Sequence, residues 1–301
     1  MALFGKKKAV LTATTAALAL ALSACGGSSG GGGTGGGSSE SAAPYSVANN
    51  VSLTGSPTFD KIKSAGKVVI GVKQDQPGLG FKDAATGEYS GFDIEIAKWM
   101  AASLGYGKDK IEFKPIPSAN RESAIQNGDV NFYVGTYSIT DKRKQQVDFA
   151  GPYFVTGQGL LVKKDNSTIN SEKDIAGKNV CSATGSTPIQ NIKANYPQTK
   201  TTEFETYSQC VEALKGGQVD AVTTDQAILI GYAAQEPDAL KVVGKPFTTE
   251  KYGIGLPKGD TAMRKFINDT LTNGKDTWQK IYDSTLGKSG TKVEQPAVEN
   301  Y

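Results

Sequence analysis

Strand-like and helix-like segments alternate along most of this 301-residue chain, and that alternation limits the folds open to it. The apolar run KVVIGV (Lys67–Val72) is typical of a buried strand. An amphipathic helix follows, with Asp93 as a suitable N-cap and Gly105 at its end. Its apolar stripe consists of Ile96, Trp99, Met100 and Leu104. The segments IEFKPI and VNFYVG, with the short helix NRESAIQNG between them, continue a pattern that predicts an α/β fold with mostly parallel strands.

A second set of alternating segments begins near Leu160. The alternation then returns with YGIGLPKG and two amphipathic helices, Ala262–Leu271 and Asp276–Leu286. The chain is longer than one small core requires, so two lobes are expected, with the polypeptide crossing between them twice. A ligand site between two such lobes would lie at the carboxyl ends of the strands. The polar stretch from Lys288 onward is expected to be loose.

The first 51 residues carry the marks of export. Lys6, Lys7 and Lys8 precede an apolar segment too short to span a membrane, and LSAC ends at Cys25. LSAC resembles the bacterial lipobox, which implies a signal peptide over 1–24 and lipidation of Cys25; an ordinary secretion signal cleaved nearby is the alternative. The Gly/Ser-rich segment 25–51 predicts a flexible tether, with the folded part beginning around Ser52 to Phe59.

Composition excludes several functional classes. The net charge of +3 includes the three lysines of the signal, so the exported chain is close to neutral and lacks the basic excess of a nucleic-acid-binding protein. Histidine is absent, which removes Ser-His and Cys-His nucleophiles and His-based metal sites.

Two cysteines remain beyond Cys25. In an exported protein, Cys181 and Cys210 suggest a disulfide, with two buried free thiols as the alternative. In the chain-entropy account, closing a loop of roughly 30 residues would add about 3–4 kcal/mol of stability.

Several motifs, in consistent order from about Lys61 to Gly287, resemble those of family 3 extracellular solute-binding proteins of ABC amino-acid importers. They are YSGFDIEIAKWMAASLG, GTYSITDKRKQQVDFAGPYF and GGQVDAVTTDQAIL. The resemblance implies a two-lobed periplasmic-binding-protein-like fold of type II, with two mixed sheets joined by two hinge strands. Lobe 1 would span about 52–154 and 249–301, and lobe 2 about 155–248.

The stretch GTYSITDKR is predicted to bind the carboxylate of an amino acid. Arg143 offers a planar fork that matches a carboxylate, and Thr136 and Ser138 add hydroxyl and backbone donors. Thr140 suits the N-cap of the short helix that follows. The alternative is a loop whose arginine pairs with Asp141 or faces solvent; the family resemblance favours the carboxylate site.

Lobe 2 would supply the complementary groups. The resemblance places Asp225 on the ligand ammonium, although Asp225 also suits the N-cap of the helix after it. In ATGSTP, the backbone N–H groups with the hydroxyls of Ser186 and Thr187 could approach the ligand carboxylate. A simple turn with a serine cap and a proline in the first helical turn is the alternative for this motif.

Ligand preference is expected to depend on four further positions, Ser118, Arg121, Lys73 and Asp75. PSANR resembles the SxNR segment of the glutamate- and aspartate-binding branch, which implies that Arg121 takes a side-chain carboxylate with help from Ser118. Lys73 lies where that branch has another cation. The alternatives are an exposed helical Arg121 beside Glu122 and a solvated Lys73. Asp75, in the unusually long loop QDQPGLGF, could blunt the acidic preference or favour asparagine or glutamine if it faced the ligand.

The sequence thus predicts a lipid-anchored, extracytoplasmic binding component of an ABC transporter that captures L-glutamate or L-aspartate and passes it to a permease. We expect a monomer with no enzymatic activity, cofactor, metal site or nucleic-acid partner. The alternatives are a preference for L-glutamine or L-asparagine, an enzyme of the cyclohexadienyl dehydratase kind on the same fold, and a ligand-dependent sensory module.

Overall fold

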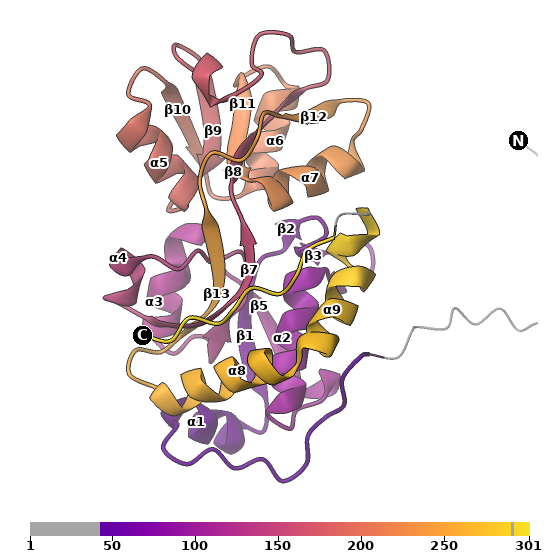
Figure 1. Cartoon of the computed structure of the whole chain (residues 1–301), viewed down its shortest axis with the longest axis vertical. Coiled ribbons are helices and arrows are strands. Elements are labelled where there is room, and N and C mark those ends of the chain that lie inside the picture. The colour runs from indigo at the N-terminus through magenta and orange to yellow at the C-terminus, as the bar shows by residue number, and fades with distance from the viewer. Residues whose placement is uncertain (1–42, 290–291) are drawn as a thin grey trace, which may run out of the picture. The chain divides into compact units, whose positions relative to one another are not determined.

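The structure, a computed structural model, describes residues 43–289 and 292–301, and its larger elements form two lobes (Figure 1). We call lobe 1 the part built on the sheet with strand order β5-β1-β6-β13-β7. Its first three strands run parallel, whereas β13 is antiparallel to both β6 and β7. The strands are β1 (Val68–Val72), β5 (Ile111–Pro115), β6 (Phe132–Tyr133), β7 (Asp148–Thr156) and β13 (Glu250–Leu256).

Lobe 2 is built on the sheet with strand order β10-β9-β11-β8-β12. The neighbours of β9 run parallel to it, and β8 pairs antiparallel with both β11 and β12. Each sheet is therefore mixed, as the family resemblance implied. The strands are β8 (Gln158–Lys163), β9 (Asn179–Ala183), β10 (Lys200–Phe204), β11 (Ala221–Asp225) and β12 (Leu240–Val243).

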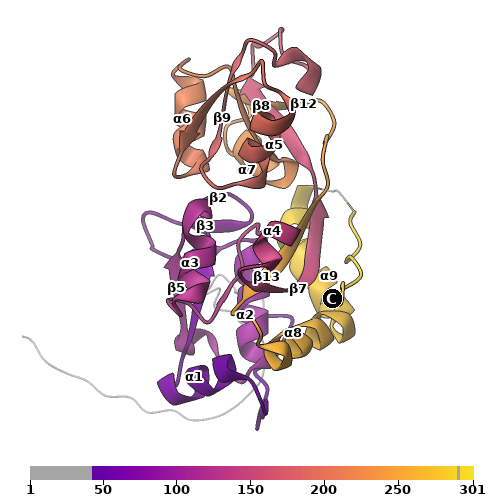
Figure 2. The same ribbon diagram turned by 90° about the vertical axis from the view of Figure 1, so that its left-hand side faces the viewer.

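Helices cover these sheets, and a small third sheet extends lobe 1 toward lobe 2 (Figures 1 and 2). That sheet consists of β2 (Asp75–Gln76), β3 (Gly80–Lys82) and β4 (Tyr89–Ser90). Lobe 1 carries α1 (Pro57–Ala65), α2 (Phe92–Ser103), α3 (Arg121–Gln126), α4 (Asp141–Lys144), α8 (Thr261–Asn273) and α9 (Lys275–Ser284). Lobe 2 carries α5 (Thr187–Asn195), α6 (Tyr207–Lys215) and α7 (Gln226–Gln235). Short 3-10 turns are η1 (Lys108–Lys110), η2 (Ser118–Asn120), η3 (Glu172–Asp174) and η4 (Leu286–Ser289).

The chain passes between the two sheets twice. Gly157 is the single residue between β7 and β8, and residues 244–249 connect β12 to β13. The two connections run close together, because a Cβ atom added to Gly157 would lie 2.2 Å from the carbonyl oxygen of Thr248. The lobe boundaries expected from the sequence stay a proposal.

Helix α2 confirms the expected apolar stripe but not the expected cap. Ile96, Trp99, Met100 and Leu104 are all buried. The N-cap is Gly91 rather than Asp93, which lies within the first turn with its carboxylate directed to other partners. Gly91 suits this position because its φ of 114° is unfavourable for residues with a Cβ atom.

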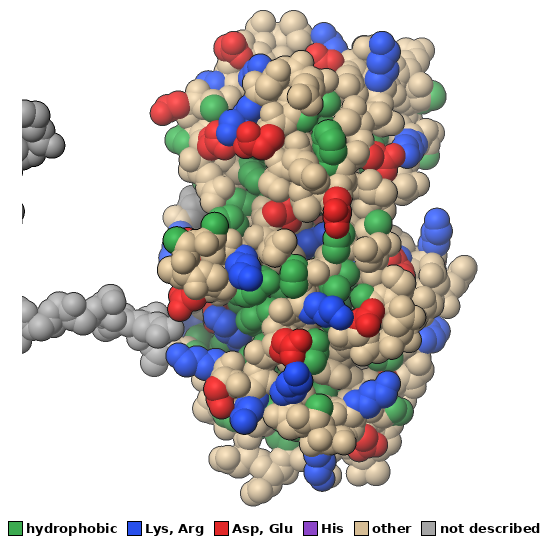
Figure 3. Space-filling view, turned by 180° about the vertical axis from the view of Figure 1, so that it is seen from behind, with side chains coloured by type: hydrophobic (Ala, Val, Ile, Leu, Met, Phe, Trp, Pro, Cys, Tyr) green, Lys and Arg blue, Asp and Glu red, His purple; other side chains and the backbone are tan. Residues whose placement is uncertain are grey.

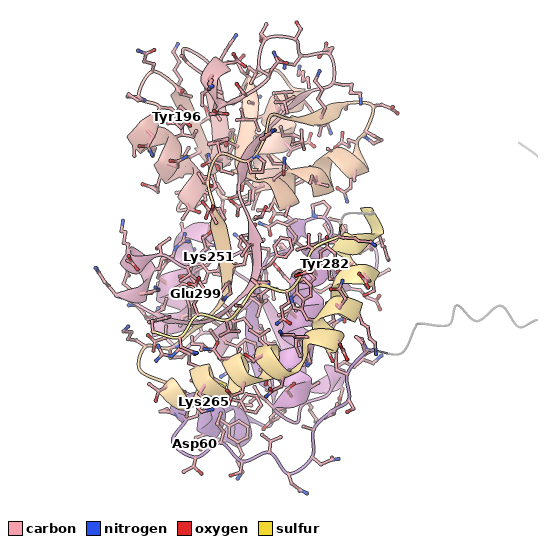
Figure 4. All side chains as sticks on the ribbon, viewed as in Figure 1. Asp60, Tyr196, Lys251, Lys265, Tyr282 and Glu299 are labelled. Atoms are coloured by element: carbon pink, nitrogen blue, oxygen red, sulfur yellow. A yellow bond between two sulfur atoms is a disulfide. The ribbon has the colours of Figure 1, made fainter. Side chains whose placement is uncertain are left out.

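The prediction of a loose C-terminal stretch is wrong for residues 292–301. The backbone N–H of Glu299 donates to the carbonyl of Gly151, and the Tyr301 hydroxyl accepts from Phe149 N at 2.7 Å. Glu299 also pairs with Lys251 of β13, as the labelled residues in Figure 4 show. The segment therefore lies along the outer edge of β7 and satisfies the Phe149 N–H and the Gly151 carbonyl there.

At the other end, Tyr45 and Ala48 already contact lobe 1, through Glu95 and the Ala102 carbonyl. The signal 1–24 and Cys25 lie outside the described residues. Within 43–289 and 292–301, no helix has the length and apolar character that crossing a bilayer requires. Basic and acidic side chains are interspersed on the face seen in Figure 3.

Candidate functional site

The nine residues predicted to bind the ligand lie where the two lobes meet. Eight of them are buried and Thr187 is half-buried. Contacts between the lobes join them: Arg143 Nη2 donates to the Gly185 carbonyl at 3.1 Å, and the hydroxyls of Thr187 and Ser138 are 3.3 Å apart. Lobe 1 contributes Lys73, Ser118, Arg121, Thr136, Ser138 and Arg143, and lobe 2 contributes Ser186, Thr187 and Asp225.

Arg143 is held by three acceptors from different segments. Its Nε donates to Glu122 Oε1 at 3.0 Å and its Nη1 donates to the Ser138 carbonyl at 2.8 Å, in addition to the bond to Gly185. Thr140 caps α4 by accepting from Arg143 N, as expected. The alternative of a surface arginine paired with Asp141 is wrong, because Arg143 is buried and Asp141 pairs with Lys144. Burial is the main reason that the pKa of Arg143 is lowered.

Glu122 is a site residue that the sequence reasoning missed as a partner of Arg143. It follows Arg121 directly on α3, so the two side chains leave the helix in different directions and Glu122 reaches the guanidinium of Arg143. This acid offsets part of the positive charge that the lobe-1 cations bring together. An acid next to a predicted ligand arginine was the available signal.

Arg121 is anchored by backbone carbonyls of lobe 1. Its Nε donates to Ser118 O at 3.1 Å and its Nη1 to Thr136 O at 3.2 Å. No hydrogen bond from its Nη2 joins it to another described residue. The sequence reasoning also missed Tyr137. The centroid of its ring lies 4.4 Å from the guanidinium carbon of Arg121 and 4.9 Å from that of Arg143. Arg121 is only 2 % exposed, so the alternative of an exposed helical residue is wrong.

Lys73 completes a cluster of three cations. Its Nζ donates to Ser118 Oγ at 2.7 Å, and both residues are buried. Burial, reinforced by the nearby charge of Arg121, lowers the pKa of Lys73 to about 7. The alternative of a solvated strand end therefore does not hold.

Thr136 has a strained backbone that its neighbours maintain. Its φ of 47° lies in the left-handed region, which is uncommon for a threonine. Asp93 Oδ2 accepts from Thr136 N at 2.9 Å, while Asp93 Oδ1 accepts from the Tyr153 hydroxyl at 2.8 Å. The side-chain amide of Gln76 donates to Thr136 Oγ1 at 3.1 Å. Asp93 thus fixes the loop that carries Thr136 and Ser138 instead of capping α2.

Asp225 is the buried acid on the lobe-2 side. It occupies the N-cap position of α7, yet its side chain makes no capping bond. Its Oδ2 accepts from the Tyr252 hydroxyl at 2.7 Å, and among the described residues its Oδ1 has no hydrogen-bond partner. Burial, followed by the charge of Glu250, raises the pKa of Asp225 to about 8. Tyr252 and Glu250 lie on β13 of lobe 1, and nothing in the sequence pointed to them as partners of Asp225.

The ATGSTP turn contains the local features expected of a helix start. Ser186 Oγ accepts from Ile189 N at 3.3 Å, and proline stands in the first turn of α5. The Thr187 hydroxyl donates to Glu250 Oε2 at 2.9 Å. Gly185 is tightly placed, since a Cβ atom there would lie 2.6 Å from the Cα of Ala119 in lobe 1. The capping role of Ser186 is confirmed; contact of Ser186 and Thr187 with a ligand stays a prediction.

The structure contains the predicted disulfide between Cys181 and Cys210, which excludes the alternative of two free thiols. The bridge joins β9 to α6, and β9 leads directly into the turn at Gly185. Within 43–289 and 292–301, no three His, Cys, Asp or Glu side chains are arranged to hold a metal ion. The site thus combines buried donors suited to carboxylates with one acid suited to an ammonium group.

Comparison with known proteins places this arrangement in a family. Residues 68–288 match the family model for "Bacterial extracellular solute-binding proteins, family 3". The chain is 41% identical over 242 residues to the glutamate-binding protein GluB of Corynebacterium efficiens, a match covering 76% of this chain and 82% of the relative. It is 44% identical over 217 residues to a glutamine-binding protein of Geobacillus stearothermophilus, a match covering 72% of this chain and 82% of that relative.

Solved structures agree with the fold. An ancestral arginine-binding protein bound to arginine superposes with a TM-score of 0.69 at 38% identity, covering 74% of this chain and 99% of that one. The two-lobed architecture is therefore that of amino-acid-binding proteins.

Proposed function

Since this chain belongs to the bacterial extracellular solute-binding proteins of family 3, we propose that it is the binding component of an ABC importer that captures acidic amino acids between its lobes. The ligand carboxylates would be bound by the cations of lobe 1, and the ammonium group by Asp225 of lobe 2. Closure of the lobes would then present the loaded protein to a permease.

The unpartnered oxygen of Asp225 is the observation that carries the proposal. A buried carboxylate oxygen without a donor is costly, and its raised pKa reflects that cost. A ligand ammonium would supply both the missing donor and the missing positive charge. The nearby Arg121 and Arg143 already act on Asp225 electrostatically, so a zwitterion bound among them would meet opposite charges at both ends.

Preference for glutamate over glutamine would depend on Arg121 and Lys73. The free Nη2 of Arg121 and the Nζ of Lys73 are donors without a carboxylate partner of their own among the described residues. A side-chain carboxylate would neutralise them, whereas an amide would leave two buried cations uncompensated. We expect this difference to contribute about 2–5 kcal/mol of discrimination. Of the two relatives named above, one is a glutamate-binding protein and the other a glutamine-binding protein.

Calorimetric titration with L-glutamate, L-aspartate, L-glutamine, L-asparagine and L-arginine tests the proposal. We expect the two acidic ligands to bind most tightly, with the amides weaker by at least about tenfold. Arginine as the tightest ligand would refute the acidic preference. Failure to bind any of the five would refute the function.

Anchoring and delivery are parts of the same proposal. Lipidation of Cys25 would hold the protein at the outer face of the cell membrane, and Cys25→Ala should then release it into the medium. Uptake of labelled glutamate should fall in a strain lacking the gene if the protein serves transport; unchanged uptake would favour a sensory role. Incubation with prephenate or arogenate should give no aromatic product, since the proposed ligand groups bind without chemistry.

A further inference from the structure

Asp75 lies in the loop whose role the sequence leaves open, and its contacts are with the opposite lobe. Its Oδ2 accepts from the backbone N–H of Ser208 at 3.2 Å. The Tyr232 hydroxyl donates to the Asp75 carbonyl and lies 3.3 Å from Oδ2. Ser208 belongs to α6 and Tyr232 to α7, so one lobe-1 residue contacts two helices of lobe 2. Both ribbon views place β2 at the end of lobe 1 that faces lobe 2 (Figures 1 and 2).

The contact with Ser208 completes the N-terminus of α6. The first N–H groups of a helix have no partners within the helix and carry a partial positive charge. Thr206 accepts from Gln209 N, which leaves Ser208 N to be satisfied from outside. A carboxylate is the favoured acceptor at this position, and here it comes from the other lobe. The disulfide at Cys210 ties the same helix to β9 and so to the turn at Gly185.

The contact between Asp75 and Tyr232 is also close. Tyr232 is only 6% exposed, and burial followed by the charge of Asp75 raises its pKa well above the usual value, so the phenol remains a donor. Beside it, a Cβ atom added to Gly231 would lie 2.2 Å from the carbonyl oxygen of Pro77. The backbones of α7 and the 75–77 loop therefore approach each other as closely as glycine permits.

We propose that Asp75 and Tyr232 form an interlobe latch that stabilises the closed protein without contacting the ligand. The inference rests on the proposed function, because closure matters only if a ligand is retained between the lobes. A contact present only in the closed state lowers the free energy of that state for every ligand. The latch should therefore set how tightly and how long amino acids are held, while Arg121 and Lys73 set which one is preferred.

The obvious variant at Asp75 would confound two effects. The charge of Asp75 also acts on Lys73 and raises its pKa, in opposition to burial and Arg121. Removing that charge would change both the latch and the protonation of a proposed ligand residue. Tyr232→Phe removes only a hydroxyl and keeps the ring, so it tests the latch by itself. Glu88→Ala, which removes an exposed acid directly before β4 of the same three-stranded sheet, is the matched control for Asp75→Ala.

Affinities and dissociation rates for glutamate and glutamine should be measured by calorimetry and stopped-flow fluorescence. For Tyr232→Phe we expect both ligands to bind about tenfold more weakly, through faster dissociation, with their affinity ratio unchanged. In a double-mutant cycle, the effects of Asp75→Ala and Tyr232→Phe should be less than additive, because the Asp75 carboxylate and the Tyr232 hydroxyl lie 3.3 Å apart. Asp75→Ala should still weaken binding in the Tyr232→Phe background, because it also removes the acceptor of Ser208 N. Glu88→Ala should match the wild type.

Unchanged affinities in Tyr232→Phe, a change in only one ligand, or fully additive effects of the two substitutions would each overturn the latch. If the wild type binds neither ligand, the proposed function fails. The latch is then tested separately, by small-angle X-ray scattering of the ligand-free wild type and Tyr232→Phe. A larger radius of gyration in Tyr232→Phe than in the wild type would then support the latch, and identical curves would overturn it.

Discussion

The two sides of the lobe interface differ in how completely their charged groups are satisfied. On the lobe-1 side, each cation already has acceptors: Arg143 has Glu122 and two carbonyls, Arg121 has two carbonyls, and Lys73 has a hydroxyl. On the lobe-2 side, Asp225 has one donor and one unpartnered oxygen. Lobe 1 thus supplies all of these acceptors except the Gly185 carbonyl, which comes from lobe 2, whereas the acid of lobe 2 lacks a positively charged counterpart.

The difference bears on how a zwitterion would be recognised. Cations fixed by carbonyls need little reorganisation when a carboxylate arrives, which favours binding to lobe 1 first. Asp225 would gain most from a ligand ammonium, because its charged form is otherwise disfavoured by burial. The ligand would therefore be oriented by lobe 1 and would stabilise lobe 2 on closure.

Removing the guanidinium of Arg143 should cause the largest loss of ligand affinity of any substitution on the lobe-1 side. In Arg143→Ala we expect the dissociation constants of glutamate and glutamine both to rise by at least about a hundredfold, because Glu122 is also left without its partner. Calorimetry provides the measurement, and Lys142→Ala, at the exposed neighbouring position, is the control. Retention of near-native affinity would show that Arg143 only supports the structure.

Substitution of Arg121 tests whether this residue binds the side-chain carboxylate of the ligand rather than the carboxylate common to all amino acids. Arg121→Met should weaken glutamate by about tenfold or more while leaving glutamine within about threefold, since only glutamate loses a charged partner. Competition titration of the two ligands on one preparation measures the ratio directly. Equal weakening of both would mean that Arg121 does not read the side chain.

Closure itself can be blocked at Gly185. Gly185→Ala should weaken every amino acid by about tenfold, because the added Cβ would meet Ala119 across the interface. Gly177→Ala is a close control, since Gly177 has a φ of 75°, Gly185 one of 76°, and a Cβ atom at Gly177 meets nothing within 4 Å. If the two variants behave alike, backbone strain rather than blocked closure explains the loss.

The smallest expected effect is an exchange of protons on binding. The pKa of Asp225 is raised to about 8, so the carboxyl is mostly protonated at pH 7, and an ammonium that lowers this pKa should release a proton. The pKa of Lys73 is lowered to about 7, and a side-chain carboxylate that raises it should cause proton uptake. Glutamine should therefore release more protons than glutamate.

Calorimetry in buffers of different ionisation enthalpy measures this exchange. Asp225→Asn should abolish the release seen with glutamine, and Lys73→Met should make glutamate resemble glutamine. An equal proton release for the two ligands in the wild type would contradict the assignment of Lys73 to the side chain.

Local patterns predicted the parts of this protein that depend on near neighbours in the sequence. The Thr140 cap of α4 and the Ser186 cap of α5 are each made to a residue three positions ahead. The apolar stripe of α2 follows from the helical spacing of its residues. All three features can therefore be predicted from local spacing. Asp93 shows the limit of such reasoning. It has a capping residue's chemistry, but tertiary contacts with Thr136 and Tyr153 outweigh the local role.

From the sequence, the alternation of strands and helices predicted a two-lobed α/β fold, and two cysteines in an exported chain suggested the disulfide. The resemblance to the solute-binding family implied the candidate ligand residues, whose contact with a ligand stays a prediction. Only the tertiary structure decided the partners of those residues. Glu122 meets Arg143 across 21 residues, Tyr252 meets Asp225 across 27, and Tyr232 meets Asp75 across 157. Contacts at such separations depend on how the sheets and lobes pack, and no local pattern carries that information.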